Sequence, residues 1–199
     1  MLILRKIAIT GGLSSGKSSV GGFFKDLGAY LLDTDVVVHN LLKSSSIQQQ
    51  IVDLLGPQII KNNTLNRAQI ASLVFKDPKK LKSLEQILHP LVEDEVKKEY
   101  KKACKEKKGN LFVVEIPLLF ETNAEAYYDK TIAVIADMPI CQKRFMSKTN
   151  QDINSFNERM QRQLSQNQKS KQADFTLYNN GSLSQLKESF LKIYPQIIQ

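Results

Sequence analysis

Long apolar segments, paired cysteines and histidine clusters are all missing from this 199-residue chain. No apolar run approaches the roughly 20 residues that a helix needs to cross a bilayer, and the N-terminal MLILRK is too short for a signal peptide. Cys104 and Cys141 have neither pairing nor metal spacing, and only His39 and His89 could join them in a zinc site. We therefore expect a cytoplasmic protein in a reducing compartment, with no membrane partner.

The overall composition is that of an ordinary globular protein, with 42% hydrophobic and 24% charged residues. At this length one domain can bury a core without a metal or disulfide staple, and it can carry an inserted subdomain. The sequence thus favours a single domain.

The net charge of +8 comes mainly from two segments. The lysines of residues 96–108 close a predicted helix whose dipole they complement, so a solvated helix end explains them without a partner. A nucleic-acid-binding face is the alternative, but only Tyr100 interleaves those lysines as an aromatic residue. Residues 141–172 contain more arginine, which suits phosphate recognition better than lysine does.

Strand and helix patterns alternate at both ends of the chain, whereas the middle is helical throughout. Strands are predicted at 6–10, 29–32, 111–115, 130–136 and 175–178, and helices at 17–27, 36–42, 47–55, 67–75, 78–88, 91–108, 140–169 (a pair) and 183–193. Gly56-Pro57 and His89-Pro90 are expected to break the central helices. This order predicts an α/β fold with a five-stranded, mostly parallel sheet flanked by helices. Residues 36–108 would form an inserted helical subdomain at the rim near the carboxyl ends of the strands, where ligands bind in such sheets.

A glycine-rich turn follows the first predicted strand and fits the phosphate-loop pattern G-x-x-x-x-G-K-[ST]. In such a loop the backbone N–H groups converge on phosphate oxygens, and the next helix N-terminus adds positive potential. Lys17 would bridge the outer phosphates, and the Ser18 hydroxyl would bind Mg²⁺. The dinucleotide pattern G-x-G-x-x-G is absent, and a flexible Ser/Gly turn is the plain alternative. The helix after the loop should bury Phe23, Phe24 and Leu27.

Carboxylates follow two other predicted strands at the edge where the phosphate loop opens. Asp33 and Asp35 end the second strand, and Asp35 could take the proton of a hydroxyl acceptor or simply cap the next helix. Glu115 ends the third strand, where phosphate-loop proteins commonly keep an acid beside the metal ion; a carboxylate at a solvated strand end is the alternative. The apolar loop 116–120 is either a substrate wall or a buried packing loop.

The ordered set of motifs from Ile7 to Gly181 resembles the dephospho-CoA kinase family. The resemblance rests on TGGLSSGKSSV, Asp33-Thr-Asp35, Leu65-Asn-Arg67, His89-Pro90, EIPLLFE, Gln142 with Arg144, Arg159-x-x-x-Gln163, Ala173-Asp174 and Asn179-Asn-Gly181. Members of this family have a phosphate-loop kinase fold with a helical CoA subdomain and a helical lid, which here would be 140–172. They transfer the γ-phosphate of ATP to the 3′-hydroxyl of dephospho-CoA with Mg²⁺, in the last step of coenzyme A synthesis.

The resemblance also implies roles for particular residues. Asp35 would be the base, and Arg144 and Arg159 would come from the lid to neutralise the transferring charge, with Lys17 and Arg144 counted as catalytic beside Asp35. Arg67, His89, Glu115, Leu118 and Phe120 would lie on the acceptor side, Glu115 also being a candidate Mg²⁺ ligand. Asn179 and Gly181 would border the adenine. The ATP phosphates would be held by Gly11, Gly12, Leu13, Ser14, Ser15, Gly16, Lys17, Ser18 and Ser19.

Three positions depart from the family pattern. Glu115 stands where Asp is usual, and Lys148 stands where a second lid arginine is common, although lysine cannot make the bidentate phosphate contact. Leu13-Ser14 replaces a frequent Ile-Gly, so Ser14 must adopt the dihedrals of the loop. Another small kinase acting on a nucleotide or nucleoside is the nearest rival function, and a nucleic-acid-binding ATPase is a rival of another class.

Overall fold

A computed structural model describes residues 3–199, except the side chain of Phe75, and the chain forms two compact units. Unit 1 combines the residues up to Asp33 with those from Lys102 onward, and unit 2 is Thr34–Lys101. Among the described residues no helix is both long and apolar enough to cross a membrane.

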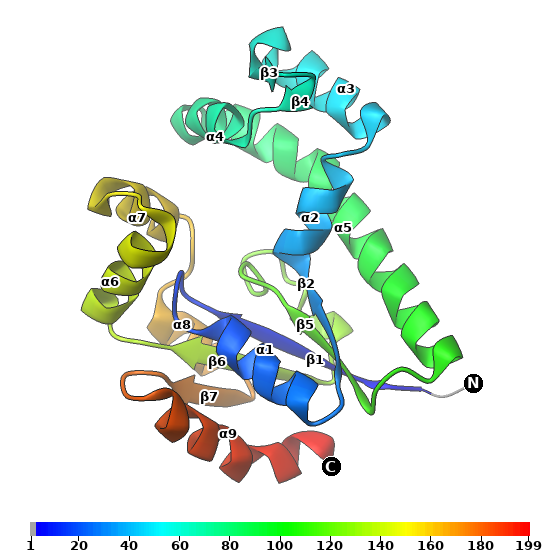
Figure 1. Ribbon diagram of the computed structural model, residues 1–199, viewed down its shortest axis with the longest axis vertical. Coiled ribbons are helices and arrows are strands. Elements are labelled where there is room, and N and C mark those ends of the chain that lie inside the picture. Colours follow the sequence, from blue (N-terminus) through cyan, green and yellow to red (C-terminus); the bar gives the residue numbers. More distant parts are fainter. Residues whose placement is uncertain (1–2) are drawn as a thin grey trace. The chain divides into compact units, whose positions relative to one another are not determined.

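Unit 1 is built on a five-stranded sheet in the order β2-β5-β1-β6-β7, in which every neighbouring pair is parallel (Figure 1). The register places Asp33 of β2 opposite Glu115 of β5, and Gly11 of β1 opposite Val134 of β6. The carboxyl ends of these strands therefore form one edge. The strands are β1 Arg5–Gly11, β2 Tyr30–Asp33, β5 Leu111–Glu115, β6 Lys130–Ile135 and β7 Phe175–Tyr178.

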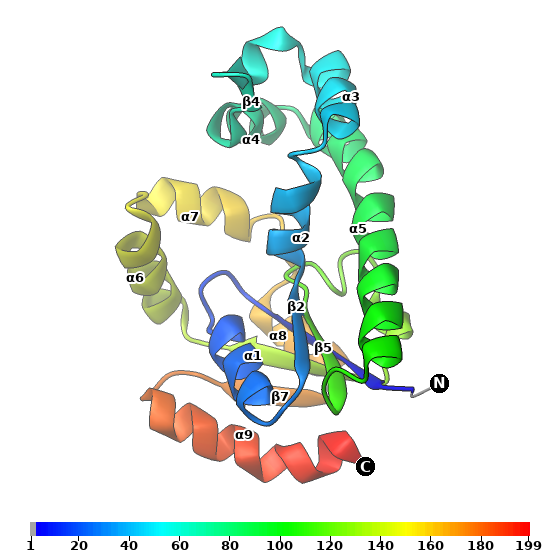
Figure 2. The same ribbon diagram turned by 45° about the vertical axis from the view of Figure 1, so that its right-hand side comes forward.

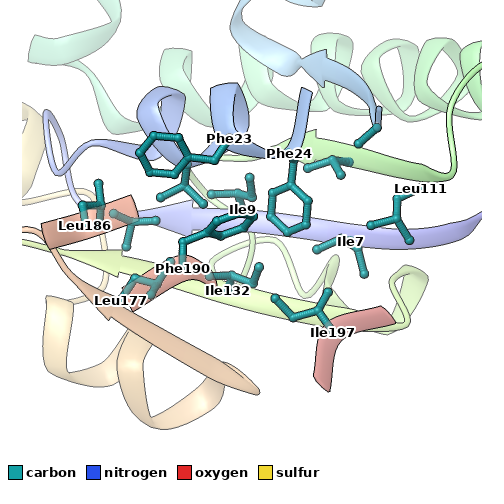
Figure 3. Packing of buried hydrophobic residues seen from close by; sticks show 14 residues of the cluster. Ile7, Ile9, Phe23, Phe24, Leu111, Ile132, Leu177, Leu186, Phe190 and Ile197 are labelled. Carbon is teal, nitrogen blue, oxygen red and sulfur yellow. The ribbon is translucent and has the colours of Figure 1, made fainter. Parts of the chain in front are cut away.

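Helices α1 and α9 pack on one face of this sheet, where Phe24 and Phe190 meet edge to face above Ile7 and Ile9 (Figure 3). Ala8, which alternates with these isoleucines and so faces the other side, packs with Leu119 and Phe120. The sheet is thus buried on both faces, as parallel sheets require. The helices of unit 1 are α1 Lys17–Asp26, α6 Met138–Thr149, α7 Ile153–Met160, α8 Gln166–Gln172 and α9 Leu183–Ile198, with a 3₁₀ turn, η2, at Glu125–Tyr127.

The prediction that Leu27 belongs to the core with Phe23 and Phe24 is wrong. Helix α1 ends at Asp26, and Leu27 is its C-cap, with a side chain 39% exposed. Because Leu27 lies beyond the last helical turn, its side chain no longer follows the buried stripe of Phe23 and Phe24.

Unit 2 has a core of its own, made by seven buried aliphatic side chains: Ile47, Ile51, Leu55, Ile59, Ile70, Val74 and Leu84. The expectation of helices throughout this segment misses a short antiparallel hairpin, whose turn residues Asn62 and Asn63 have positive φ. Asparagine tolerates that conformation. The elements are α2 Thr34–Leu41, α3 Ser45–Leu55, η1 Pro57–Ile59, β3 Ile60–Lys61, β4 Thr64–Leu65, α4 Arg67–Lys76 and α5 Pro78–Glu106, whose residues from Lys102 onward belong to unit 1.

The predicted helix break at His89-Pro90 does not exist. Helix α5 runs from Pro78 to Glu106 with Pro90 inside it, and Figure 2 shows it as one continuous ribbon. Proline removes one helical hydrogen bond and crowds the preceding turn. Leu81, Leu84, Leu88 and Leu91 nevertheless pack against the unit 2 core on both sides of Pro90. Packing of this stripe therefore outweighs the local cost of the proline.

Candidate active site

The phosphate loop joins β1 to α1 at the carboxyl edge of the sheet. Gly11 and Gly16 both have positive φ, and a Cβ on either would collide with a neighbour, the Val134 carbonyl or the Asn179 side-chain amide. Ser14 adopts φ 57° without being glycine, so the loop accommodates this departure from the family pattern. The loop geometry therefore depends on glycine at its two ends.

Lys17 is the first residue of α1, and its side chain folds back over the loop. Its Nζ donates hydrogen bonds to the carbonyl oxygens of Gly11 (3.1 Å) and Gly12 (3.0 Å). The first backbone N–H groups of a helix lack partners within the helix and carry partial positive charge. An ammonium and a helix N-terminus thus meet at this loop, which suits a phosphate chain.

Ser18 and Glu115 form the second part of this site. The Ser18 Oγ donates to Glu115 Oε2 (3.1 Å), and Glu115 is only 5% exposed. Gly21, one turn further along α1, makes room for this carboxylate, because a Cβ there would collide with Glu115 Oε1. A hydroxyl and a carboxylate, both hard oxygen donors, therefore lie together beside the loop.

Asn179 and Arg144 close the other side of the loop. Asn179 Nδ2 donates to the Ser15 carbonyl (2.8 Å), and Arg144 Nη2 donates to Asn179 Oδ1 (3.4 Å). The Arg144 Nη1 atom is buried with no hydrogen-bond partner among the described residues. A buried charged donor without a partner costs free energy, and a bound anion could accept its hydrogen bond.

The pKa of the Cys141 thiol is affected by its burial and by nearby charges. Burial raises the pKa of its thiol, while the positive charges of Arg144 and Lys17 act in the opposite direction. Burial is the larger influence, so the pKa of this thiol stays above its usual value.

Other residues expected in the site lie apart from this network. Arg159 donates to Gln151 Oε1 (3.0 Å), and its guanidinium stacks on the Phe145 ring. Gly181 is an exposed turn residue before α9. Phe120 is 5% exposed in the cluster around Ala8, which favours the packing alternative for this residue, whereas Leu118 stays half-buried.

The two remaining acceptor-side candidates, Arg67 and His89, line one cavity of about 350 Å³ in unit 2. The Asn66 side chain caps α4 by accepting from the Gln69 N–H (3.2 Å), which fixes Arg67 as the first helical residue. Arg67 Nη1 lies 3.1 Å from His39 Nδ1. The other lining residues are mainly aliphatic: Val38, Leu42, Ile51, Ile70, Ala71, Val74, Leu81, Leu84, Leu88 and Val92, with Glu85. The cavity suits a largely apolar group with a polar end.

Asp35 lies in the first turn of α2, which begins at Thr34. It is therefore inside the helix rather than the capping residue before it, so the N-cap alternative does not describe it. Asp33 is the last residue of β2, so the two aspartates lie in different elements rather than together at the end of one strand. A carboxylate in a helical first turn is favoured by the dipole.

Sequence reasoning missed four polar residues that the structure places in or beside these sites. Gln166 exchanges two hydrogen bonds with the backbone of Ala136 and lies where a Cβ on Gly12 would meet it, and Lys169 makes a buried ion pair with Glu121. His39 pairs with Arg67. Glu121 belongs to the EIPLLFE motif, so the sequence could have indicated it. Lys169 lies in a polar helix, where a lysine is normally expected to be exposed.

The sequence comparisons agree over almost the whole chain. The family model described as dephospho-CoA kinase matches residues 5–185. A dephospho-CoA kinase of Protochlamydia amoebophila is 43% identical over 199 residues, covering 99% of this chain and 98% of that protein. One of Chlamydia trachomatis serovar D is 42% identical over 197 residues, covering 98% of this chain and 96% of that protein.

Solved structures show the same fold. The crystal structure of TT1252 from Thermus thermophilus has a TM-score of 0.84 and 29% sequence identity, with 98% of each chain covered. A dephospho-CoA kinase from Campylobacter jejuni has a TM-score of 0.62 and 22% identity, again with 98% of each chain covered, and shows likeness of fold alone. With the family model and these relatives spanning nearly its full length, the chain belongs to the dephospho-CoA kinase family.

Proposed function

We propose that this chain transfers the γ-phosphate of ATP to the 3′-hydroxyl of dephospho-CoA, giving CoA and ADP. Membership of the family makes it an ATP-dependent kinase. The observation that carries the proposal is the ordered phosphate loop, with Lys17 folded over it and, beside it, the Arg144 Nη1 atom, which has no hydrogen-bond partner in the part of the chain that the structure describes. Phosphoryl transfer needs mainly positioning and stabilisation of charge, which such a loop supplies.

On the donor side, the backbone of residues 11–19 would bind the ATP phosphates. Lys17 Nζ, which here donates to two loop carbonyls, would donate to the outer phosphates instead. Arg144 would donate a hydrogen bond from Nη1 to the transferring group. Asn179, which holds Ser15, would support the loop, and Gly181 would leave space for the adenine. The phosphates would thus be contacted by backbone N–H groups and by two cations. Such preorganised positive groups stabilise the charge that develops in the transition state.

Ser18 and Glu115 fit a magnesium ion, because their side-chain oxygens already lie 3.1 Å apart at the loop. Mg²⁺ takes one or two protein oxygens and completes its shell with water and phosphates, so it needs no larger cluster. Within the described residues no group of three or more His, Cys, Asp or Glu side chains could hold a metal ion. A bound Mg²⁺ would neutralise charge on the phosphates.

Asp35 is the group we assign as general base. As the acceptor oxygen attacks the γ-phosphorus, its proton passes to the carboxylate and the bond to ADP breaks. Arg159 would reach the phosphates only after its side chain leaves Gln151 and Phe145, which belong to the same lid segment, so its role requires that side chain to reorient. Lys148, exposed at the end of α6, would add charge without the fork geometry of arginine.

The cavity of unit 2 would hold the acceptor. Its aliphatic lining suits the pantetheine arm of dephospho-CoA, and Arg67 and His89 offer polar groups to the phosphates or amides of that substrate. Leu118, half-buried in unit 1, would contact the acceptor, whereas Phe120 supports the loop from beneath. We place the reaction in the cytoplasm and expect no nucleic-acid partner.

Coupled ADP release with Mg-ATP tests the proposal when dephospho-CoA is compared with AMP, adenosine and pantetheine as acceptors. Formation of ADP and CoA with dephospho-CoA alone is the expected result. Turnover with another acceptor would keep the kinase and replace its substrate. No turnover with any acceptor, together with salt-sensitive binding to DNA or RNA, would favour the ATPase alternative.

A further inference from the structure

A buried ion pair joins α8 to the loop that follows β5. Lys169 is 0% exposed, and its Nζ lies 2.9 Å from Glu121 Oε1 and donates to the Pro117 carbonyl. The same Glu121 oxygen accepts from the Leu164 N–H (2.8 Å). Three chain segments therefore meet at one buried lysine and one carboxylate.

The loop held by Lys169 is also attached to the strand that leads into the phosphate loop. The Ile116 N–H donates to the Ile9 carbonyl (2.8 Å), and Thr10 Oγ1 donates to the Pro117 carbonyl (3.3 Å). Thr10 directly precedes Gly11. The Pro117 oxygen thus accepts from both Lys169 and the residue before the phosphate loop, so α8 and the loop share one acceptor.

A second attachment of α8 lies three residues earlier. Gln166 Nε2 donates to the Ala136 carbonyl (2.6 Å), and the Ala136 N–H donates to Gln166 Oε1 (2.9 Å). Residues three apart share a helix face, so Gln166 and Lys169 fasten one side of α8 to the ends of two strands. Helices α6 and α7 pack on each other through Phe145 and Phe156, in a cluster that also includes Ala136 and Leu13.

The energetics of the Lys169–Glu121 pair indicate that it orients α8 rather than adding to the free energy of unfolding. Burial lowers the pKa of Lys169, and the hydrogen bond and charge of Glu121 only partly oppose this. Replacing a buried ion pair by apolar residues of similar size is often neutral or stabilising. An apolar pair would, however, lose the directed bonds to Pro117 and Leu164, which fix one position of α8.

We propose that Lys169 and Glu121 are positioning residues that fix the base of the lid. In this arrangement α8 stays on the core while α6 and α7, with Arg144 and Arg159, close over the phosphates. The segment that moves is then shorter than the predicted lid 140–172 and ends before α8. The catalytic part of this inference rests on the proposed function, whereas the anchoring of α8 does not.

The test compares Lys169→Met with Lys171→Met, which changes an exposed lysine on the same helix. For Lys169→Met we expect kcat to fall by about 10- to 100-fold, the order of loss that a misplacement of about 1 Å produces. KM for ATP should change by less than about threefold, since the phosphate loop itself is intact. Lys171→Met should match wild type. A folded Lys169→Met with wild-type kcat would overturn the proposal.

A double variant, Lys169→Met with Glu121→Leu, covers the case in which the single variant fails to fold. It removes both charges, so we expect a stable protein whose kcat stays lowered. Recovery of the wild-type kcat would reduce the pair to a structural role and contradict the inference.

Amide hydrogen exchange separates this inference from the proposed function. In either folded variant the amides of α8 and of residues 116–121 should exchange at least about tenfold faster, while those of α1 remain as in wild type. This comparison needs no turnover. Should the wild type fail to phosphorylate dephospho-CoA, unchanged exchange in α8 would still refute the anchor, and faster exchange would still support it.

Discussion

The two candidate binding regions differ in how their polar groups are held. Around the phosphate loop of unit 1, the side chains of Lys17, Ser18 and Asn179 each donate a hydrogen bond to a loop carbonyl or to the Glu115 carboxylate. In unit 2 the cavity is lined mainly by aliphatic side chains, and its Arg67 is paired with His39. The phosphate-loop region is therefore specified by backbone shape, and the cavity of unit 2 by the surface of packed helices.

This difference implies different responses to mutation. A site made by backbone N–H groups and one preorganised cation loses transition-state stabilisation when that cation is removed. A cavity with apolar walls distributes its binding free energy over many contacts, so one polar residue contributes a smaller share. We expect losses in turnover from the phosphate loop of unit 1 and losses in acceptor affinity from the apolar cavity of unit 2. Asp35 of unit 2, the assigned base, does not line that cavity and is expected to affect turnover.

The largest effect is expected for Lys17→Ala. Removal of the ammonium from the loop should lower kcat by about 10³-fold, because no other side chain of α1 can replace its charge on the phosphates. Steady-state ADP release measures this loss. Lys25→Ala, which changes an exposed lysine in the last turn of α1, should behave as wild type. Wild-type turnover in Lys17→Ala would remove the loop from the mechanism.

The second-largest effect is expected for Asp35→Asn. Its kcat should fall about 10²-fold or more while its affinity for ATP stays nearly intact, because an amide cannot accept the proton of the acceptor hydroxyl. Single-turnover kinetics and nucleotide titration separate these two quantities. Asp53→Asn, in α3 of the same unit, serves as the control carboxylate. Full activity of Asp35→Asn would leave the base to be found elsewhere.

The smallest of the three effects is expected for Arg67→Met. It should raise KM for dephospho-CoA about tenfold and change kcat little, because one charged hydrogen-bonding contact to the acceptor is lost. Lys76→Met, at the other end of α4, provides a matched change of charge. If kcat instead fell as far as in Lys17→Ala, the contrast between a binding cavity and a catalytic loop would not hold.

Much of unit 1 was predictable because its patterns are local. Glycine at positions 11 and 16 is required by backbone dihedrals and close contacts, and Lys17 and Ser18 follow at fixed spacing in the same turn. Parallel strands then brought Glu115 to the same edge, as its position at the end of a strand implied. Here the order of residues along the chain is enough to indicate the chemistry.

Other features depended on contacts distant in sequence. Local rules for proline predicted a break at Pro90, but leucines on both sides of it pack into the unit 2 core and keep α5 whole. The pairing of His39 with Arg67 and of Glu121 with Lys169 joins residues far apart along the chain. Spacing carries no information about such pairs.

By itself, then, the sequence determined the α/β order, the phosphate loop and the family, because each depends on the types of neighbouring residues. Tertiary structure alone decided that α5 is unbroken, that Leu27 is exposed while Lys169 is buried, and that Arg144 keeps a buried Nη1 without a partner among the described residues. These outcomes are sums of many weak packing and solvation contributions from distant segments, and no short stretch of chain contains them.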